Sequence, residues 1–555
     1  MDQSTDVDKI LTSLGKFGKY QKIQLLIILI CNMENCFHLI STVYIGFRPT
    51  YRCDDINTTL YLEDRHIDVH NVSHIGVNYQ KCAIEITTNI SDIQYRYTEV
   101  CINGYKYDIG KDMSTVTEWN LFCNGAQRSE FAQTLVMIGQ AVGALIFSPI
   151  ADRFGRKPAN VAARILYFAT ALATVFAPNI EAFSVFRFLQ GTFQGGSVMT
   201  CTILYIEILP KEIRHIPEGL ASTTWTTGLV FVSVVGYLLR DFSWRYLQLI
   251  LALVSCHALF DWLFLDESLR WLMANNKYDQ TEKLLRKAAR INNVNYESVI
   301  ENTTMSSRIL KCSDRAVVED KDQMLNVDHE KTEVEKYTIL TVLKHKRMLL
   351  SSIVLWIAWI TNTLTYFGLM LTTSKLSGDR YLNNIIASLA EYPAVIMQQL
   401  LINRIGRISL LIIFHGIASV SLVLATICNT YEDKYTWLPI LATVFSFIGR
   451  FAITGSFSTV FVYTPELYPT NLRNVGLGMA STISRLGSML SPFAITLADY
   501  VFWGPAAVFA TLNVIVTITL LFLPETMGRT LPTTVNELKT WHKDKKTTQF
   551  CELYE

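Results

Sequence analysis

Apolar residues along this chain gather into long runs that are separated by polar segments. Twelve of these runs are about 18 to 25 residues long, the length that a helix needs to cross the hydrocarbon core of a bilayer. They cover residues 21-45, 131-150, 160-178, 182-207, 218-239, 245-264, 349-371, 383-402, 408-428, 437-462, 475-497 and 505-523. The pattern predicts an all-α membrane protein with twelve transmembrane helices.

Three polar phrases at the edges of these runs recur in the second half of the chain, 251 to 259 residues later. The pairs are 152-156 with 403-407, 207-214 with 466-473, and 265-268 with 523-526. A membrane protein whose halves repeat in parallel is most simply interpreted as two pseudo-symmetric bundles of six helices around a central path. This organisation indicates a transporter.

Composition narrows the class further. Half of the 555 residues are hydrophobic, 17% are charged and the net charge is +1, whereas a soluble chain of this length would carry more charge. The small net charge gives no indication of a nucleic-acid partner. The sequence has no phosphate-binding loop, Cys-x-x-Cys pair or nucleophile elbow, so we do not expect an enzyme or catalytic residues. The first apolar run lacks a small-residue cleavage site and is expected to remain as span 1.

Basic residues in the connecting segments predict the orientation. Lys and Arg gather before span 1 and after spans 2, 4, 8 and 10, which places those connections and both termini in the cytoplasm. The predicted parts are 1-46, the N-terminus and span 1; 47-128, an extracellular loop; 129-264, spans 2 to 6; 265-347, a cytoplasmic linker; 348-523, spans 7 to 12; and 524-555, a cytoplasmic tail. Within the linker, the pattern of Leu272 to Ala289 predicts helix, and residues 313-335 are expected to be mobile.

The extracellular segment carries the marks of an oxidising, glycosylated compartment. It has three sequons, at Asn57, Asn71 and Asn89, and an even set of cysteines suited to two disulfides, namely Cys53, Cys82, Cys101 and Cys123. The sequence leaves their pairing open. A fourth sequon, at Asn302, is cytoplasmic and is expected to stay unmodified. His66, His70 and His74 recur every four residues and would share a face on a helix, but we interpret them as a solvated loop and predict no metal site.

The recurring phrases combine acids, arginines and a glycine. Gly155 and Gly406 permit tight reversals between neighbouring spans. Arg153 and Arg156 can bridge to acids at the ends of other helices, so that ion pairs close the cytoplasmic side and break as the halves rock. The alternative is that these charges only anchor helix ends at the level of the lipid headgroups. The predicted gating residues are Asp152, Arg153, Arg156, Glu207, Arg214, Glu267, Arg404, Arg407, Glu466, Arg473 and Glu525.

These phrases belong to a longer ordered set that carries a resemblance. The set includes 117-121, 152-157, 267-272, 366-369, 466-470, 484-488 and 523-526. Over nearly its whole length the chain resembles the organic cation, organic anion and carnitine (zwitterion) transporters of the major facilitator superfamily, with the pattern closest to the carnitine branch. The resemblance implies the major facilitator fold and transport by alternating access. Two departures occur: Ser148 stands where the loop motif usually has glycine, and the first loop has four cysteines where many relatives have six.

Ionisable residues near the middle of a span cost about 2.5–3.5 kcal/mol on insertion scales, so each is a functional hypothesis. Arg485 in span 11 is the most informative, because its guanidinium can hold a carboxylate with paired hydrogen bonds. The resemblance implies an acid at this position in cation carriers and Arg in anion and carnitine carriers. Val395 stands where anion carriers often place Lys. The alternative is that Glu34 or Glu391 neutralises Arg485 internally.

Aromatic residues in spans 5, 7 and 10 would complete a site for an ammonium group, which a ring attracts by about 1–2 kcal/mol. The predicted substrate-binding residues are Arg485, Asn35, Glu34, Gln140, Trp225, Tyr366, Phe367, Glu391, Phe457 and Ser458. We interpret His38, His257 and His415 as helix-contact residues rather than proton relays.

The sequence therefore predicts a plasma-membrane carrier of small organic ions, above all carboxylate-bearing zwitterions or organic anions. Its expected partners are the substrate and the lipid bilayer; a monomer is sufficient, and no cofactor is expected. Whether Na⁺, H⁺ or exchange drives transport stays open. The alternatives are an organic cation carrier, a sugar facilitator of the same fold, and a receptor or scaffold that no longer transports. The sugar facilitator is disfavoured because span 7 lacks a Gln-Gln-Leu-Ser-Gly pattern.

Overall fold

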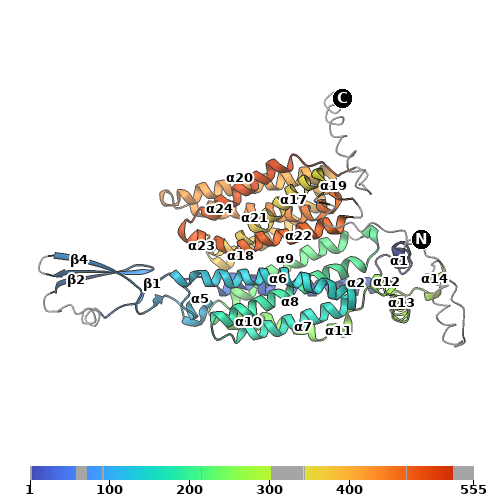
Figure 1. Cartoon of the computed structure of the whole chain (residues 1–555), viewed down its shortest axis with the longest axis horizontal. Coiled ribbons are helices and arrows are strands. Elements are labelled where there is room, and N and C mark those ends of the chain that lie inside the picture. Colours follow the sequence, from blue (N-terminus) through green and yellow to red (C-terminus); the bar gives the residue numbers. More distant parts are fainter. Residues whose placement is uncertain are drawn as a thin grey trace, which may run out of the picture.

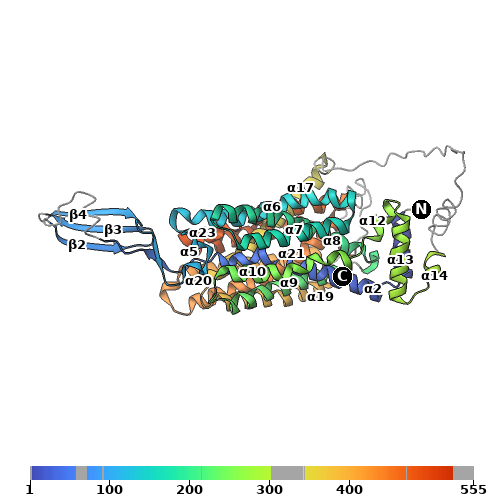
Figure 2. The ribbon, with the colours of Figure 1, turned by 90° about the horizontal axis from the view of Figure 1, so that it is seen from below.

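The computed structural model describes residues 3-57, 72-90, 93-213, 215-301, 342, 344-469 and 472-528. Two helical bundles, one from each half of the chain, lie side by side, and a small β-sheet projects from one end (Figures 1 and 2). Short helices near the N-terminus lie at the opposite end. We call these the sheet end and the terminus end.

The first bundle contains the six spans predicted for the first half. They are α2 (Lys19–Glu34) with α3 (Phe37–Ile45), α6 (Ala126–Phe154), α7 (Arg156–Val175), α8 (Ile180–Glu207), α9 (His215–Leu238), and α10 (Trp244–Val254) with η5 (Ser255–Leu259) and α11 (Asp261–Phe264). The first and sixth spans are therefore interrupted, the first at Asn35 and Cys36 and the sixth by a 3-10 turn. A short interruption or 3-10 turn inside a longer helix often marks a functional hinge or a strained sequence.

The second bundle repeats this arrangement. Its elements are α17 (Lys346–Thr372) with η6 (Thr373–Lys375), α18 (Arg380–Leu389) with α19 (Glu391–Ile405), α20 (Arg407–Thr430), α21 (Leu438–Leu467), α22 (Arg473–Leu490) with α23 (Phe493–Tyr500), and α24 (Gly504–Leu520). Among the described residues, nine helices are long and apolar enough to cross a membrane by length and composition. The remaining predicted spans correspond to α8, to the α22–α23 pair, and to α24, which has 17 residues.

Glycines let α6 and α8 approach each other closely. A Cβ added at Gly195 would lie 2.3 Å from the carbonyl oxygen of Gln140, and one added at Gly191 would overlap the backbone of Val136. Small residues at such positions allow two helices in a bilayer to pack backbone against backbone. The sequence analysis does not assign Gln194 to the site, yet this approach brings it beside Gln140.

The segment predicted to be extracellular forms β-structure, which the sequence analysis did not predict. Strand β1 (Tyr51–Cys53) pairs with β5 (Tyr105–Tyr107), and β2 (Val72–Tyr79), β3 (Ala83–Ile90) and β4 (Ile93–Val100) form an antiparallel sheet in that order. Two short turns, η2 (Lys111–Met113) and η3 (Cys123–Gly125), and the short helix α5 (Thr115–Glu118) follow. The alternation of buried Ile84 and Ile86 with more exposed neighbours is the period-two signal of a strand and was present in the sequence.

Two disulfides hold this segment together, as predicted, and the structure resolves their pairing. Cys53 is joined to Cys101, and Cys82 to Cys123. Of the three sequons, Asn57 is exposed, Asn89 lies on β3, and Asn71 lies outside the described residues. His74 lies on β2, so a shared helical face for the histidine run does not extend to it; His66 and His70 lie outside the described residues.

Four short helices pack together at the terminus end: α1 (Gln3–Ser13), α12 (Leu269–Ala274), α13 (Tyr278–Asn292) and α14 (Tyr296–Glu301). The predicted helix from Leu272 to Ala289 is thus two helices, separated at Asn276, whose φ is +55°. A shared apolar core that includes Ile10 and Leu285 joins α1 to α13. Residues 313-335 and Asn302 lie outside the described residues.

Candidate functional site

Arg485 lies on α22 at the contact between the two bundles. Its Nη1 donates a hydrogen bond to Oε1 of Gln140 on α6, 3.1 Å away. Nε2 of Gln140 in turn donates to Oε1 of Gln194 at 3.0 Å, and Gln194 donates to the carbonyl oxygen of Asn35 at the interruption of span 1. Three of the predicted site residues, Arg485, Gln140 and Asn35, are therefore joined in one chain that crosses the bundle interface.

No carboxylate neutralises Arg485 within the described part of the chain. Glu34 forms an ion pair with Arg164 instead, with 2.6 Å between Oε1 and Nη2. Glu391 accepts hydrogen bonds from Nε and Nη2 of Arg450, at 3.0 and 2.8 Å. The internal neutralisation weighed in the sequence analysis is therefore not what the structure shows. Equally, neither acid offers a free carboxylate to an ammonium group.

The predicted aromatic residues meet at the bundle interface. The hydroxyl of Tyr366 on α17 accepts a hydrogen bond from Nε1 of Trp225 on α9 at 3.0 Å and donates to Glu391 at 3.2 Å. Phe457 stacks on Tyr366 with 6.1 Å between ring centroids, and Phe367 meets it edge-on at 5.3 Å. These contacts fix the orientation of the rings. Ser458, also predicted, is half-buried beside Phe457 on α21.

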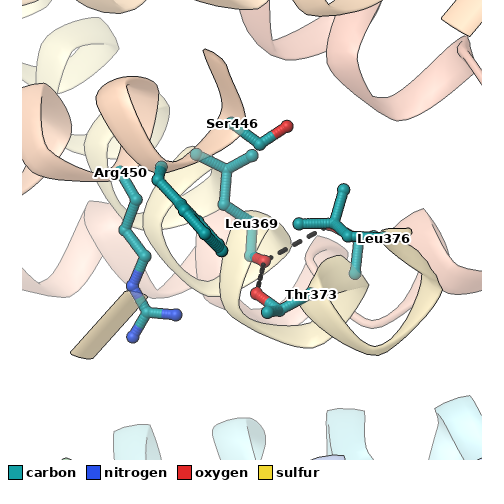
Figure 3. A pocket seen from close by; sticks show the side chains of 7 residues that line it. Leu369, Thr373, Leu376, Ser446 and Arg450 are labelled. Atoms are coloured by element: carbon teal, nitrogen blue, oxygen red, sulfur yellow. Dashed lines mark hydrogen bonds between the residues drawn. The ribbon is translucent and has the colours of Figure 1, made fainter. Parts of the chain in front are cut away.

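A small cavity lies beside Arg450 (Figure 3). It is lined by residues of α17, η6 and α21, including Leu369, Thr373 and Ser446, and its volume is about 20 Å³. That is room for a water molecule and not for an organic ion. We therefore interpret Arg450 as the counter-charge of Glu391 and do not assign it to substrate binding.

Two further groups of charged residues form ion pairs that the sequence did not predict. Arg164 lies inside the predicted span 160-178 and so met the criterion applied to the other intramembrane charges. At the sheet end, Arg48 forms ion pairs with Glu130 on α6 and with Asp499 on α23. Lys375 also pairs with Asp499, at 2.7 Å. Of these pairs, Arg48–Asp499 joins the first bundle to the second at the sheet end, whereas Arg48–Glu130 lies within the first bundle and Lys375–Asp499 within the second.

The recurring phrases form two matching turns at the terminus end. Arg156 pairs with Asp152 at 2.9 Å and with Glu207 at 3.4 Å, and in the second half Arg407 pairs with Glu466 at 3.2 Å. Partners predicted from the repeat are thus brought together. Each of these pairs lies within one bundle.

An acid from a later segment caps the helix that begins at each turn. Oε1 of Glu267 accepts from the backbone N–H of Arg156 at 2.9 Å, and Oε1 of Glu525 accepts from that of Arg407 at 2.9 Å. The first N–H groups of a helix have no intrahelical partner and attract negative charge. Burial raises the pKa of the Glu267 carboxyl, while the backbone N–H donors of Ser268, Lys157 and Arg156 oppose that rise.

Glycine is required at both turns. The φ angles of Gly155 and Gly406 are +115° and +101°, a region that side chains rarely adopt. A Cβ at Gly406 would lie 2.6 Å from Oε2 of Glu525, and one at Gly155 would lie closer still to Glu267. The absence of a side chain therefore makes both the turn and the cap possible.

Other predicted gating residues are not in ion pairs in the described structure. Arg153 and Arg404 are exposed, and Arg153 lies over the ring of Phe154. Nε of Arg473 lies 3.4 Å from the carbonyl oxygen of Tyr468. Arg214 lies outside the described residues.

A family model described as "Sugar (and other) transporter" matches residues 87–537. Solute carrier family 22 member 6 of Rattus norvegicus is 30% identical over 456 residues, which are 81% of this chain and 78% of that protein. This chain belongs to solute carrier family 22. Organic cation/carnitine transporter 2 of Homo sapiens is 29% identical over 96% of this chain and 94% of that protein. The xylose transporter XylE from E. coli, in a partially occluded inward open conformation, superposes with a TM-score of 0.60 at 16% identity and covers 92% of this chain and all of its own.

These likenesses confirm the predicted fold and class. At 16% identity XylE shows the fold alone, which is that of the major facilitator superfamily. Membership of solute carrier family 22 makes the chain a membrane transporter of organic ions and not an enzyme.

Replacing Gly406 with alanine is expected to destabilise this family 22 member by roughly 1–3 kcal/mol, because the side chain is strained at that φ and displaces Glu525. The measurement is the apparent melting temperature in detergent at a fixed scan rate. Gly416→Ala is the matched control: it lies inside the same helix, and a Cβ there meets nothing within 4 Å. Its melting temperature should stay equal or rise slightly. Equal melting temperatures for the two variants would contradict the strain argument.

Arg450→Met is expected to cost about 3–5 kcal/mol, because it leaves the Glu391 carboxylate buried without a counter-charge. Adding Glu391→Gln should recover most of that loss, since the amide carries no charge. The melting temperatures of the two single variants and the double variant form a mutant cycle that measures the pair. Strictly additive losses would mean that the two side chains do not depend on each other.

Proposed function

We propose that this transporter carries small organic ions with a carboxylate group, in the first place zwitterions such as carnitine, across the plasma membrane. The observation that supports this is the state of Arg485: a half-buried guanidinium between the bundles whose one polar contact in the described structure is the neutral Gln140. A cation in that place lacks a charged partner, and a substrate carboxylate supplies one with charge-assisted hydrogen bonds.

The aromatic group at the bundle interface is suited to the ammonium end of a zwitterion. Trp225, Tyr366 and Phe457 present ring faces and edges at the same interface, and rings attract a desolvated ammonium. Because Arg450 already neutralises Glu391, this region carries no free negative charge to hold a simple cation. An unpaired guanidinium in the described structure, together with neutral aromatic rings, favours a zwitterion over an organic cation. An organic anion satisfies Arg485 equally and is the second candidate.

Transport follows by alternating access around this interface. In the described structure the Arg48–Asp499 pair joins the bundles at the sheet end, which we assign to the outside, and Lys375 holds the same acid from within the second bundle. The ion pairs of the recurring phrases at the terminus end stay within single bundles. We propose that Arg156 and Arg407 keep the cytoplasmic end of each bundle rigid as the halves rock, and that exposed Arg153 and Arg404 find acids across the interface when that end closes.

Arg485→Ala is expected to lower uptake of radiolabelled L-carnitine by roughly 10- to 100-fold, the value of a pair of hydrogen bonds to a charged group. Arg485→Lys should be intermediate, because it keeps the charge and loses the paired geometry. Leu486→Ala, the exposed neighbour on the same helix, is the control and should match the parent. Carnitine uptake that survives Arg485→Ala would remove the central claim.

A competition screen separates the substrate classes. Carnitine and ergothioneine should compete with each other, tetraethylammonium should compete poorly because it has no carboxylate, and para-aminohippurate tests the anion candidate. Inhibition by para-aminohippurate but not by the zwitterions would make the chain an anion carrier. Inhibition by tetraethylammonium alone would overturn the proposal.

Asp499→Asn should loosen the sheet end, since it removes the acid that Arg48 and Lys375 share. The readout is the rate at which a membrane-impermeant maleimide labels Thr134→Cys, whose hydroxyl in the parent contacts the carbonyl oxygen of Met489 across the interface. If the variant loses about 1 kcal/mol of the free energy that favours the closed sheet end, the open state becomes roughly fivefold more populated. Labelling should then be faster by the same factor.

The control for this experiment is Asp55→Asn. Asp55 is an extracellular acid whose pKa Arg52 and Lys106 hold at about 2, so the variant removes the same charge without touching the bundle interface. It should leave the labelling rate unchanged. Equal rates in Asp499→Asn and in the parent would show that these pairs do not hold the sheet end closed.

A further inference from the structure

A second buried charge cluster lies inside the first bundle, and neither the proposed substrate site nor the gating residues use it. Its members are Glu34 at the end of α2, Arg164 on α7, and His257 and Asp261 on the interrupted sixth span. Arg164 lies between the two acids, with Nη2 2.6 Å from Glu34 and Nη1 2.9 Å from Asp261.

The ring of His257 bridges the same two carboxylates. Its Nε2 contacts Oε1 of Glu34, and its Nδ1 lies 3.3 Å from Oδ1 of Asp261. An ionised carboxylate only accepts hydrogen bonds, and a neutral imidazole has only one N–H to donate. Both contacts are therefore satisfied together only when the cluster holds one additional proton, on the ring or on one carboxyl.

The count of charges supports the same conclusion. Without that proton, Glu34 and Asp261 carry two negative charges against one positive charge on Arg164; with it, the cluster is neutral. A net charge inside a bilayer is costly, so the protonated cluster is the favoured one. One contact opposes a positive charge on the His257 ring, because Nη2 of the positively charged Arg164 lies 3.4 Å from both ring nitrogens. The other titratable groups packed against the cluster are the phenol of Tyr167 and the thiol of Cys201, which add no charge.

One member of the cluster is partly exposed, and the cluster is linked to the proposed substrate site. The side chain of His257 is 33% exposed, while those of Glu34, Arg164 and Asp261 are 6% exposed or less. His257 also lies on the 3-10 turn that interrupts the span. Glu34 directly precedes Asn35, whose carbonyl oxygen begins the hydrogen-bonded chain through Gln194 and Gln140 to Arg485 described above.

We propose that His257, Glu34 and Asp261 form a proton-binding site and that the carrier moves one proton inward with each substrate. Cotransport rather than exchange follows from the separation of the two sites: the proton and the carboxylate of the substrate occupy different residues, so both are bound at once. This inference rests on the proposed function, because it supplies the driving ion for the same transport.

The test uses the full chain reconstituted in liposomes, with radiolabelled L-carnitine and the membrane voltage clamped at zero by potassium and valinomycin. An inward proton gradient of one pH unit should drive accumulation of up to about tenfold, and a protonophore should abolish it. Carnitine–carnitine exchange is measured in parallel without a gradient. Exchange without any effect of the gradient would overturn the proton site and leave the proposed function standing. Absence of both would overturn the proposed function and this inference with it.

Two variants locate the effect. His257→Gln removes the proton acceptor, and Asp261→Asn leaves a cluster that is neutral without the proton, so each should lose gradient-driven accumulation and keep exchange. His415→Gln is the control, because the ring of His415 contacts Asn513 and Ser456 and no carboxylate; it should accumulate like the parent. If His257→Gln or Asp261→Asn reduced exchange and accumulation in the same proportion, or left accumulation intact, the role would be structural and the proposal wrong.

Discussion

A charge that lies within the bilayer must find its counter-charge inside the protein, and the interior of this carrier is arranged around that requirement. Arg164 is balanced by Glu34 and Asp261, and Arg450 by Glu391. Arg187 meets the requirement with neutral acceptors, among them the carbonyl oxygen of His38 and the amide of Gln133. In the part of the chain that the structure describes, the guanidinium of Arg485, between the bundles, is left with the amide of Gln140 alone. Under the proposed function, the pairing of the other charges is what leaves Arg485 available for a substrate carboxylate.

The repeated phrases also pair charges, at the ends of the helices. Both turns contain a glycine and an arginine, and their acids have two different roles. Glu207 and Glu466 pair with the arginine side chain, joined in the first turn by Asp152, whereas Glu267 and Glu525 cap the backbone. Because the acids that pair with the arginine and the acids that cap the helix belong to the same bundle as the turn, each turn stabilises its own bundle. Rigid bundles are what a rocking mechanism requires, since flexible ones would absorb the movement.

Much of this architecture can be predicted from the sequence, because a bilayer imposes a single length scale on the chain. The apolar runs locate the helices, and the cysteines predict two disulfides. The sheet between α3 and α6 was not predicted, because the alternation around Ile84 and Ile86 is short and lies among polar residues. The pairing of charged residues between helices could not be predicted, for another reason. Glu34 and Arg164 are 130 positions apart, and whether an acid in one helix faces an arginine in another depends on helix rotations that periodicity leaves undefined.

The sheet has a consequence for how the molecule moves. Cys53 follows span 1 closely, Cys123 precedes α6 at once, and both are cross-linked into the sheet, so its strands are fastened covalently to the first bundle. A stiff extension attached to one of two rocking bodies behaves as a lever arm. A tilt of a few degrees between the bundles becomes a sweep of several ångströms at the tip of β2 to β4.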